Sequence, residues 1–399
     1  MFWQKKLEKF VEQVAANQEL PMGIHLWNGQ QIDLSNDPKV IVDVPSLASL
    51  RHLIHPSLDS LGEAYVEGKL KVQGSVTDII DIASRLVEAA PDTTMQHSKP
   101  RHFRHSRKVD AESISYHYDV SNDFYKAWLD KNMVYSCGYF NSLDDSLDQA
   151  QEQKIDHILT KIRLQPGQKL LDVGCGWGAL IIRAAQKYGA KATGVTISQQ
   201  QFDEAQRRIK AAGLEDCCEV KLLDYRDVTG KYDRITSVGM FEHVGLANLE
   251  SYFRKLNDLL EDDGIIMNHG ITSSDPDSGG APAGGGDFID KYVFPNGELP
   301  HISMVLHEMA KAGLEPTDAE NLRRHYAITL EHWAARFEAQ SEKLQQMVDE
   351  KHFRIWRVYL AGCAHAFHQN WVAIYQVVAT KAGRYSLPLT REYMYQDKK

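Results

Sequence analysis

The chain has 399 residues, of which 43% are hydrophobic and 25% charged, a composition typical of a globular protein with one large core and a second, smaller one. Its formal charge of −9 gives no overall attraction to nucleic acid, so we expect no nucleic-acid partner. The five cysteines lack paired spacing and no window approaches the roughly 18 consecutive apolar residues of a membrane span, so we expect a cytoplasmic protein that is not threaded through a bilayer.

Helical spacing of apolar residues predicts an amphipathic helix at the start of the chain. The side chains that repeat at this spacing are Phe2, Trp3, Leu7, Phe10, Val11 and Val14. We expect this face to pack against its own domain, with contact to a membrane surface as the alternative. A strand pattern over 39–44 and a helix pattern over 76–90 follow, so residues 1–95 are predicted to form a small α+β domain.

Residues 96–112 break the periodicity and are predicted to be a linker between two domains. Five basic residues and no acidic residue lie within 97–108, namely Lys99, Arg101, Arg104, Arg107 and Lys108. A solvated linker is the favoured interpretation, and contact with anionic lipid headgroups, worth about 1 kcal/mol per charge, is the alternative. The apolar helical face over 353–367 is a further candidate for a membrane contact, although such a face more often belongs to the core.

From 113 to 399, strand and helix patterns alternate, which predicts an α/β fold with a mostly parallel, doubly wound sheet. The seven expected strands lie near 169–174, 191–198, 218–224, 233–239, 264–270, 315–322 and 372–380, and the last of them closes the sheet. Helices are expected over 248–260, near 302–312 and up to about residue 370. The loop over 273–287 is too long and polar for the core, so it is predicted to be either mobile covering or a lid.

The stretch “LDVGCGWGAL”, beginning at Leu171, places Gly174, Gly176 and Gly178 between a buried strand and a helix. Backbone without side chains at the carboxyl end of a first strand lets a bulky ligand approach closely. The G-x-G-x-G spacing favours S-adenosylmethionine over a dinucleotide, whose fingerprint is G-x-G-x-x-G, although that fingerprint would tolerate Ala179. A turn with no ligand is the remaining alternative.

Polar residues near the glycines support the same cofactor. Asp172 precedes them and can pair with the cationic amino-acid end of S-adenosylmethionine, or else cap the turn. The second strand ends in “GVTISQQQ”, so Thr196 and Gln201 would offer neutral hydrogen bonds where dinucleotide-binding sites usually place an acid for the ribose. This departure argues further against a dinucleotide.

Seven separated motifs extend the pattern beyond a generic methyltransferase. They are “YHYDVSNDFYKAWLD” (116–130), “MVYSCGYF” (133–140), “LLDVGCGWGAL” (170–180), “VTISQQQ” (195–201), “LDYRDV” (223–228), “VGMFEHVG” (238–245) and “KYVFPNGELP” (291–300). In this order the motifs resemble the cyclopropane fatty acid synthase family, which includes the mycolic acid cyclopropane synthases. The resemblance covers roughly 113–385 and implies the Rossmann-like fold of class I S-adenosylmethionine-dependent methyltransferases. The small leading domain is similar to that of the bacterial phospholipid-modifying branch.

The resemblance implies transfer of a methylene unit from S-adenosylmethionine to the cis double bond of an acyl chain in membrane phospholipid, which forms a cyclopropane ring. Methyl addition leaves a carbocation, and aromatic faces can stabilise positive charge without reacting. The aromatic candidates are Tyr135, Tyr139, Phe140, Phe241, Tyr292 and Phe294, more than half of which we expect to be ordinary core residues. The base that removes the proton is, by the same resemblance, a bound bicarbonate ion.

The resemblance also assigns residues to the two ligands. The residues matched to the bicarbonate site are Cys137, the Gly239 backbone, Glu242, His269 and Tyr326. The cofactor contacts are Tyr135 and Ser136 at the amino-acid end, Gly174 and Gly176 at the turn, Thr196 and Gln201 at the ribose, and Tyr225 and Arg226 beside the adenine. Arg226 is equally suited to a surface ion pair. The separations of Cys137, Glu242 and His269 give no metal signature, so we expect no metal.

Two other functions stay open. A related acyl-chain methyltransferase would form a methyl branch because the carbocation loses its proton elsewhere or is reduced. A lipid-binding or scaffold protein would keep the fold without turnover, which the complete set of four bicarbonate-site side chains argues against. Under the main hypothesis the partner is a phospholipid membrane surface that the protein meets peripherally, and the resemblance is compatible with a homodimer.

Overall fold

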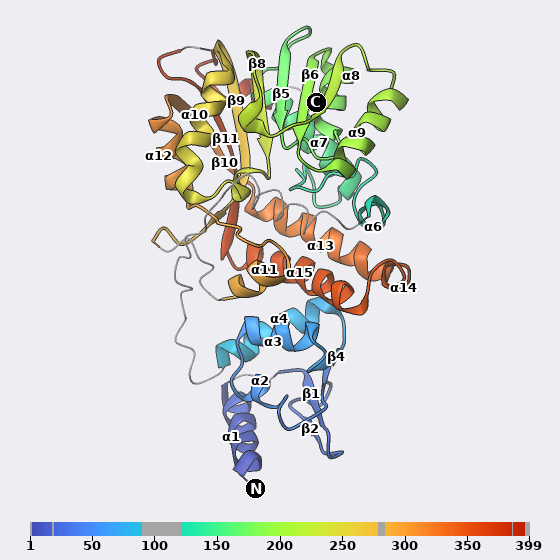
Figure 1. Cartoon of the computed structure of the whole chain (residues 1–399). Coiled ribbons are helices and arrows are strands. Elements are labelled where there is room, and N and C mark those ends of the chain that lie inside the picture. The colour runs from blue at the N-terminus through green and yellow to red at the C-terminus, as the bar shows by residue number, and fades with distance from the viewer. Residues whose placement is uncertain (1, 18–19, 90–120, 278–283, 385, 396–399) are drawn as a thin grey trace.

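The computed structural model describes residues 2–17, 20–89, 121–277, 284–384 and 386–395. Within them the chain forms a four-stranded sheet near the N-terminus and a seven-stranded sheet with helices on both faces (Figure 1). The predicted linker over 96–112 lies outside the described residues, as do residues 278–283 of the predicted loop over 273–287.

The N-terminal unit, residues 2–17 and 20–89, mixes helices and strands as the sequence predicts. Its elements are α1 (Phe2–Asn17), β1 (Met22–Leu26), β2 (Gln31–Asp33), β3 (Val40–Val44), α2 (Arg51–Ile54), α3 (Leu58–Val66), β4 (Lys71–Gln73) and α4 (Val76–Ala89). The strand order is β2-β1-β3-β4, with β1 and β3 parallel. Leu7, Phe10 and Val14 of α1 are buried in the core of this unit, so these three side chains take the packing role expected for the apolar face.

The large sheet contains all seven expected strands. They are β5 (Lys169–Val173), β6 (Lys191–Thr196), β7 (Cys218–Leu222), β8 (Tyr232–Val238), β9 (Leu260–Ser273), β10 (Leu314–Asn321) and β11 (Val372–Lys381). The order is β10-β11-β9-β8-β5-β6-β7, and β5 to β9 pair in parallel. Together with the helices, this is the expected α/β methyltransferase architecture.

One detail of the topology differs from the sequence prediction. The last strand, β11, does not close the sheet at its edge but lies between β9 and β10, antiparallel to both. Its burial explains the position, since nearly all of β11 is buried, whereas β10 alternates between covered and exposed side chains. An alternating strand suits an edge, and a continuously apolar strand needs neighbours on both sides.

Helices cover both faces of the large sheet. The described helices that follow the N-terminal unit are α6 (Asn122–Lys126), α7 (Leu147–Lys161), α8 (Ala179–Tyr188), α9 (Gln199–Ala211), α10 (Leu249–Leu259), α11 (Gly286–Tyr292), α12 (Ile302–Lys311), α13 (Arg323–Ala339), α14 (Ser341–Gln345) and α15 (Glu350–His368). The short 3-10 turns are η1 (Tyr225–Asp227), η2 (Phe241–His243), η3 (Leu246–Asn248) and η4 (Glu392–Met394). Helices α7, α8 and α9 share one core with the sheet, and α10 and α12 share another. Helices α13 and α15 lie between the large sheet and the N-terminal unit (Figure 1).

The N-terminal unit is attached to α11 through its helix α3. Both oxygens of Asp59 accept backbone hydrogen bonds, from Gly285 at 3.1 Å and from Phe288 at 2.8 Å. The hydroxyl of Tyr292 donates to Glu67 at 2.8 Å. These bonds hold α11, which follows the predicted loop over 273–287, against the N-terminal unit.

A buried ionic cluster joins α7 to the edge strand β10. The Lys161 ammonium, which is fully buried, lies 2.5 Å from Glu320 Oε2 and 3.4 Å from Asp318 Oδ2, and His157 Nε2 lies 2.8 Å from the same Glu320 oxygen. Burial alone would raise the pKa of Glu320, but the hydrogen bond from His157 and the charge of Lys161 outweigh it and lower the pKa to about 2. The cluster therefore stabilises the folded state only while Glu320 is ionised.

We predict that Glu320→Gln lowers the free energy of unfolding by roughly 3 kcal/mol at pH 7, because it removes the nearest partner of the buried Lys161 ammonium and leaves only the longer pair with Asp318 at 3.4 Å. The folded-state pKa of Glu320 is depressed from 4.5 to about 2, so its stabilisation is complete above pH 4.5 and is lost as the pH falls toward 2. Urea denaturation at several pH values should therefore show that the difference in free energy of unfolding between wild type and variant shrinks as the pH falls from 4.5 toward 2.

Glu219→Gln is the matched control, since Glu219 forms an exposed ion pair with Lys221 at 2.8 Å. Such a pair contributes about 0–1 kcal/mol. Equal effects of the two substitutions at pH 7 would contradict a stabilising role for the buried cluster.

Candidate active site

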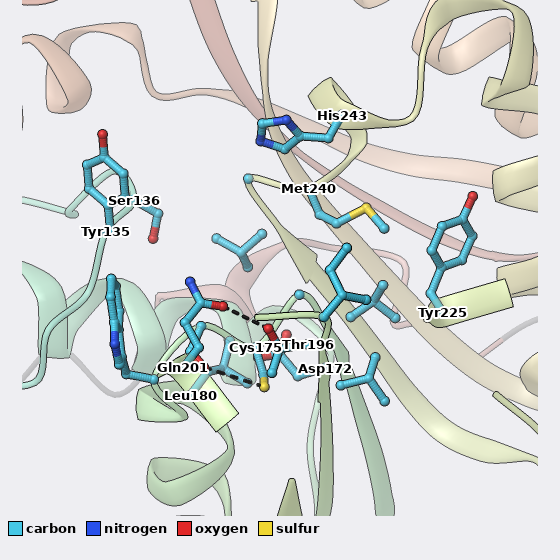
Figure 2. Close-up of a pocket in the computed structure, with 18 of the residues that line it drawn as sticks. Tyr135, Ser136, Asp172, Cys175, Leu180, Thr196, Gln201, Tyr225, Met240 and His243 are labelled. Atoms are coloured by element: carbon cyan, nitrogen blue, oxygen red, sulfur yellow. Dashed lines mark hydrogen bonds between the residues drawn. The ribbon is translucent and has the colours of Figure 1, made fainter. Parts of the chain in front are cut away.

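The large sheet reverses its strand order at β5, because β6 lies on one side of β5 and β8 on the other. Open α/β sheets bind ligands at such a switch point, beyond the carboxyl ends of the strands. A cavity of about 300 Å³ lies there. Its lining includes every residue predicted for the cofactor, namely Tyr135, Ser136, Asp172, Gly174, Gly176, Thr196, Gln201, Tyr225 and Arg226. In Figure 2, Tyr135 and Ser136 lie on one side of the cavity and Tyr225 on the other.

The turn after β5 requires glycine. Gly174 has φ +79° and Gly176 φ +54°, in the left-handed region that other residues rarely adopt. A Cβ on Gly174 would also lie 3.1 Å from Met240 Cγ. The amides of Gly174 and Cys175 both donate to the Val195 carbonyl of β6 at 3.0 Å, so the turn is held against its neighbouring strand. It presents bare backbone to the cavity.

Cys175, between the glycines, is a packing residue. Its side chain is buried, and a Cβ on Gly194 of β6 would lie only 2.7 Å from its sulfur. The thiol therefore fills the space over Gly194, as a structural role predicts.

Asp172 brings a carboxylate to the cavity. Its Oδ1 accepts a hydrogen bond from Thr236 Oγ1 at 2.7 Å, and no other side-chain bond holds it. Burial raises the pKa of Asp172 to about 6, against the Thr236 hydrogen bond and the Lys154 charge, which lower it. A cationic group bound beside Asp172 would stabilise its ionised form, so the site suits a ligand ammonium.

Neutral and aromatic groups line the rest of the cavity. Thr196 Oγ1 donates to Gln201 Oε1 at 2.8 Å, so the Gln201 amide hydrogens are left to donate to a ligand (Figure 2). Arg226 forms a two-pronged ion pair with Asp224, with Nε–Oδ1 at 2.8 Å and Nη2–Oδ2 at 2.6 Å, and its guanidinium lies 5.5 Å from the centre of the Tyr225 ring. Arg226 thus lines the cavity and makes the ion pair that the sequence left as its alternative role.

The Glu242 side chain accepts a hydrogen bond from β9 just beyond the carboxyl end of β8, where no strand is present to do so. The β8–β9 ladder ends where Val238 pairs with His269, so the next β9 amide on that side, Ile271, has no strand partner. Glu242 Oε1 accepts from this amide at 2.7 Å, and Glu242 Oε2 is buried with no hydrogen-bond partner in the described part of the chain. Burial raises the pKa of Glu242 to about 7, although the Ile271 amide opposes the rise. The side chain can therefore act as a hydrogen-bond acceptor or, when protonated, as a donor.

His269 contributes a second unmatched polar atom. Its Nδ1 lies 3.1 Å from Nε2 of Gln376 on β11, and with the amide in this orientation Nδ1 accepts, which places the proton of the neutral imidazole on Nε2. That Nε2 is buried and has no partner among the described residues. Burial lowers the pKa of His269, and the charges of Lys154 and Lys161 lower it further. Unmatched buried polar atoms are rare in folded proteins, so a buried acceptor and a buried donor fit a small polar ligand.

Cys137 and Tyr326 complete the predicted set. Tyr326, Tyr359 and Cys137 pack in one core cluster. Burial raises the pKa of Tyr326, and the charges of Tyr359, Cys137, Cys363 and Glu242 raise it further. Burial also raises the pKa of the Cys137 thiol, whose sulfur lies 3.2 Å from the Gly138 carbonyl oxygen. Both side chains therefore stay protonated at neutral pH. None of the four predicted side chains lines the cofactor cavity itself.

Gly239 differs from its predicted role. It lines the cofactor cavity at φ +65°, but its amide donates to the His269 carbonyl at 2.8 Å. This bond leaves Gly239 no amide proton for an anion. The Gly239 amide therefore belongs to the turn after β8, and only the carbonyl of its backbone stays a candidate contact for the predicted bicarbonate.

Tyr135 is the aromatic candidate with the most aromatic neighbours. Its ring centre lies 5.6 Å from that of Trp128 and 5.2 Å from that of Trp333, and its hydroxyl donates to the Tyr359 hydroxyl at 3.1 Å. Phe294 packs on the same Tyr359, with ring centres 5.9 Å apart. Of these rings Tyr135 alone lines the cavity, so its face is the one that a positive charge bound there can meet.

The other aromatic candidates have different partners. Tyr139 and Phe140 stack on His325, Phe241 packs beneath Gly270, and Tyr292 bonds to Glu67 of the N-terminal unit. These are core and contact roles, as expected for most of the set. Trp128 and Trp333, which surround Tyr135, were not selected from the sequence because they lie 7 and 198 positions away from it.

Lys154 of α7 lines the cavity and was also missed. Its signal in the sequence is a lysine at a core position of the helix, four residues before the buried Ile158 and seven after the buried Leu147. Asp224, which holds Arg226, is a second missed residue, and an acid directly after a strand was the signal for it.

We predict that Gly270→Ala lowers the free energy of unfolding by about 1–3 kcal/mol, because its Cβ would lie 1.6 Å from Phe241 Cε1 and must displace that ring and the adjacent Glu242. Adding Phe241→Leu to Gly270→Ala should recover part of the loss. Gly362→Ala is the control, since the nearest atom to its Cβ is 4.0 Å away. Thermal unfolding checks all three, and an unchanged Gly270→Ala protein would contradict this packing.

Comparisons with known proteins agree with the geometry. A family model described as mycolic acid cyclopropane synthetase matches residues 105–377, and a domain family of unknown function matches residues 8–93. The chain is 48% identical over 382 residues to a probable fatty acid methyltransferase of Pseudomonas putida, covering 94% of this chain and 97% of that relative.

Two further relatives bear on the site. The chain is 33% identical over 345 residues to the cyclopropane-fatty-acyl-phospholipid synthase of Escherichia coli K12, covering 83% of this chain and 85% of the relative. The solved structure of mycolic acid cyclopropane synthase CmaA1 complexed with SAH and CTAB superposes with a TM-score of 0.65 at 34% identity, covering 68% of this chain and 98% of that one. The chain belongs to the mycolic acid cyclopropane synthetase family.

Proposed function

We propose that the protein transfers a methylene unit from S-adenosylmethionine to the cis double bond of an acyl chain in membrane phospholipid and closes a cyclopropane ring. The observation that carries this proposal is a pair of buried atoms, Glu242 Oε2 and His269 Nε2, that have no partner among the described residues. Glu242 directly precedes His243, and His269 pairs with Val238, and both of these neighbours line the cofactor cavity. The relatives named as cyclopropane synthases, one of them solved with SAH, support it.

The cavity residues fit S-adenosylmethionine, which when bound supplies an electrophilic methyl group on its sulfonium. Asp172 has one oxygen left for the ammonium of the amino-acid end. The Gln201 amide can donate to a ribose hydroxyl, because Thr196 occupies its carbonyl oxygen. Tyr225 offers a ring face to the adenine. These contacts fix where the methyl group must lie, which converts a slow encounter into a positioned reaction.

An isolated alkene is a weak nucleophile, so the protein must hold it close to the methyl group and keep water away. Tyr135 supplies apolar surface of this kind because it lines the cavity, and the fully buried Trp128 and Trp333 pack against its ring. Positive charge that develops on the acyl chain would face the Tyr135 ring, whose quadrupole attracts it. The net reaction adds one CH2 to the alkene and releases one proton.

The unmatched pair also fits bicarbonate, which when bound supplies a base for that proton. His269 Nε2–H would donate to one oxygen, and the protonated Tyr326 and Cys137 could donate to others. Glu242 Oε2 would accept from the hydroxyl of the ion or, when protonated, donate to it. The backbone amide of Ile271 keeps Glu242 in this orientation.

We further propose that the protein meets its substrate as a peripheral protein on the cytoplasmic face of the membrane. No helix among the described residues is long and apolar enough to cross a bilayer. A lipid chain would therefore have to leave the leaflet and enter the protein. The basic stretch over 97–108 stays a candidate contact with anionic headgroups.

Methyl branching is the second candidate. It is favoured by the relative of 48% identity, which is named a probable fatty acid methyltransferase and not a cyclopropane synthase. The two reactions share methyl transfer and differ in where the proton is lost. A base held beside the new methyl group favours the ring.

We predict that vesicles of a cis-unsaturated phospholipid, incubated with the protein and S-adenosylmethionine, yield acyl chains heavier by one CH2 that contain no double bond. Mass spectrometry of the released chains, with fully saturated vesicles as the control, measures this. Methyl-branched or methylated unsaturated chains would select the second candidate instead. Absence of any product would favour a lipid-binding protein without turnover.

We predict that Glu242→Gln retains binding of S-adenosylhomocysteine but lowers the rate of product formation by about 10²–10⁴-fold, the usual contribution of a group in acid–base chemistry. Binding persists because Glu242 does not line the cofactor cavity. Calorimetry and the vesicle assay give the two readouts. Glu250→Gln on the surface of α10 is the control, and undiminished turnover in Glu242→Gln would remove this residue from the mechanism.

A further inference from the structure

Helix α7 buries a lysine whose charge the fold leaves unpaired. Lys154 is only 2% exposed, and its Nζ donates to Ser136 Oγ at 2.8 Å. Burial lowers the pKa of Lys154 to about 8, although the charges of Cys137, Asp130 and Asp172 oppose this. Burying an ammonium group costs several kcal/mol unless an anion compensates it.

No carboxylate compensates Lys154 among the residues that the structure describes. Lys161, two turns along the same helix, lies 2.5 Å from Glu320, whereas Lys154 has a hydroxyl as its sole hydrogen-bond partner there. Neither nearby acidic residue, Asp130 or Asp172, forms an ion pair with Lys154 in the described part of the chain. Both oxygens of Asp130 accept backbone amides, from Val134 at 2.7 Å and Asn132 at 2.8 Å, and Asp172 accepts from Thr236.

The position of Lys154 indicates which anion is missing. It lines the cofactor cavity together with Ser136, Asp172 and Gly174, the residues at the end predicted for the amino-acid part of the cofactor. That part carries one ammonium and one carboxylate. Asp172 suits the ammonium, so the carboxylate requires a cation.

The other basic side chains of the cavity are less suited to this role. Arg226 is already paired with Asp224, and it directly follows Tyr225, which lies on the opposite side of the cavity from Ser136 (Figure 2). His243 lies on η2 beside Phe294, with ring centres 5.5 Å apart. Lys154 is the cation that the fold brings to Ser136.

We propose that Lys154 binds the carboxylate of the amino-acid end of S-adenosylmethionine, with Ser136 holding the lysine ammonium in place. The inference deepens the proposed function, on which it rests for the identity of the cofactor. Asp172 and Lys154 would then bind the two charges of one zwitterion from different elements, β5 and α7. Because the two contacts are separate, they fix the direction of the amino-acid end as well as its position.

The test is calorimetric titration of the wild-type protein with three ligands. S-adenosylhomocysteine carries the carboxylate, its decarboxylated analogue lacks only that group, and 5′-methylthioadenosine lacks the whole amino-acid end. We expect the wild type to bind S-adenosylhomocysteine about 10–100-fold more tightly than the decarboxylated analogue, the range for one charge-assisted hydrogen-bonded pair. Similar affinity for both would overturn the proposal without any variant being needed.

Lys154→Met then assigns the effect to this residue. The variant should lose about 10–100-fold in affinity for S-adenosylhomocysteine but change little toward the decarboxylated analogue or methylthioadenosine. Equal losses for all three ligands would mean that Lys154 only shapes the cavity, which overturns the proposal. Lys187→Met is the control, since Lys187 pairs with Asp156 on the surface and should leave all three affinities unchanged.

The ligands also separate this inference from the proposed function. A wild-type protein that binds none of them would show that the cofactor class is wrong, and the inference would fail with it. A wild type that binds S-adenosylhomocysteine and its decarboxylated analogue equally would overturn the role of Lys154 alone. Vesicle turnover by the wild type would stand in that case.

Discussion

The candidate site depends on one hydrogen bond at the place where strand β8 ends. Beyond Val238 the sheet has no strand to pair with the Ile271 amide, and an unpaired buried amide costs roughly 1–3 kcal/mol. Glu242 Oε1 meets this requirement at 2.7 Å, which commits one carboxylate oxygen to the fold and leaves the other facing the interior without a partner. The requirement of the sheet for an acceptor is therefore what orients the proposed reactive group. Phe241, packed where Gly270 has no side chain, holds the turn in that place.

The N-terminal unit is connected to this turn through a continuous series of contacts. Asp59 holds the start of α11, and the chain that leaves α11 passes Phe294, whose ring lies 5.5 Å from that of His243. Further along, Glu298 Oε2 accepts the Leu246 amide at 2.8 Å, and the Glu298 amide lies 3.4 Å from the Glu242 carbonyl. The segment between α11 and α12 is thus bound at one end to the N-terminal unit and at the other to the turn that carries Glu242. A unit that the sequence presents as a separate leading domain contributes to the surroundings of the site.

The sequence predicted those features that are encoded locally. All seven strands of the large sheet coincide with segments that the local strand pattern predicts, and the cofactor cavity follows from the glycine turn and the residues matched to it. The features it did not predict depend on contacts between distant segments. The internal position of β11 is set by how apolar β10 and β11 are relative to each other, and the bond from Gly239 to His269 is set by where the β8–β9 ladder ends. Likewise, whether a tryptophan such as Trp333 faces Tyr135 follows from the packing of α13 and not from any motif.

Lys154 and Lys161 illustrate how far a local pattern can go. Both lie on the covered face of α7, and the sequence gives no reason to treat them differently. In the folded chain Lys161 has Glu320 as its partner and stabilises the junction with β10, whereas Lys154 extends into the cavity with only a hydroxyl beside it. Natural sequences generally give each buried polar group a hydrogen-bond partner. A buried polar group without one therefore indicates a site where a ligand supplies the partner. Among the described residues, Glu242 and His269 each keep one buried atom without a hydrogen-bond partner, and Lys154 has a hydroxyl but no carboxylate beside it, so the three groups are one acceptor, one donor and one cation. That combination is complementary to a small oxyanion beside a zwitterion, so the groups that mark the site also indicate the charges of its ligands.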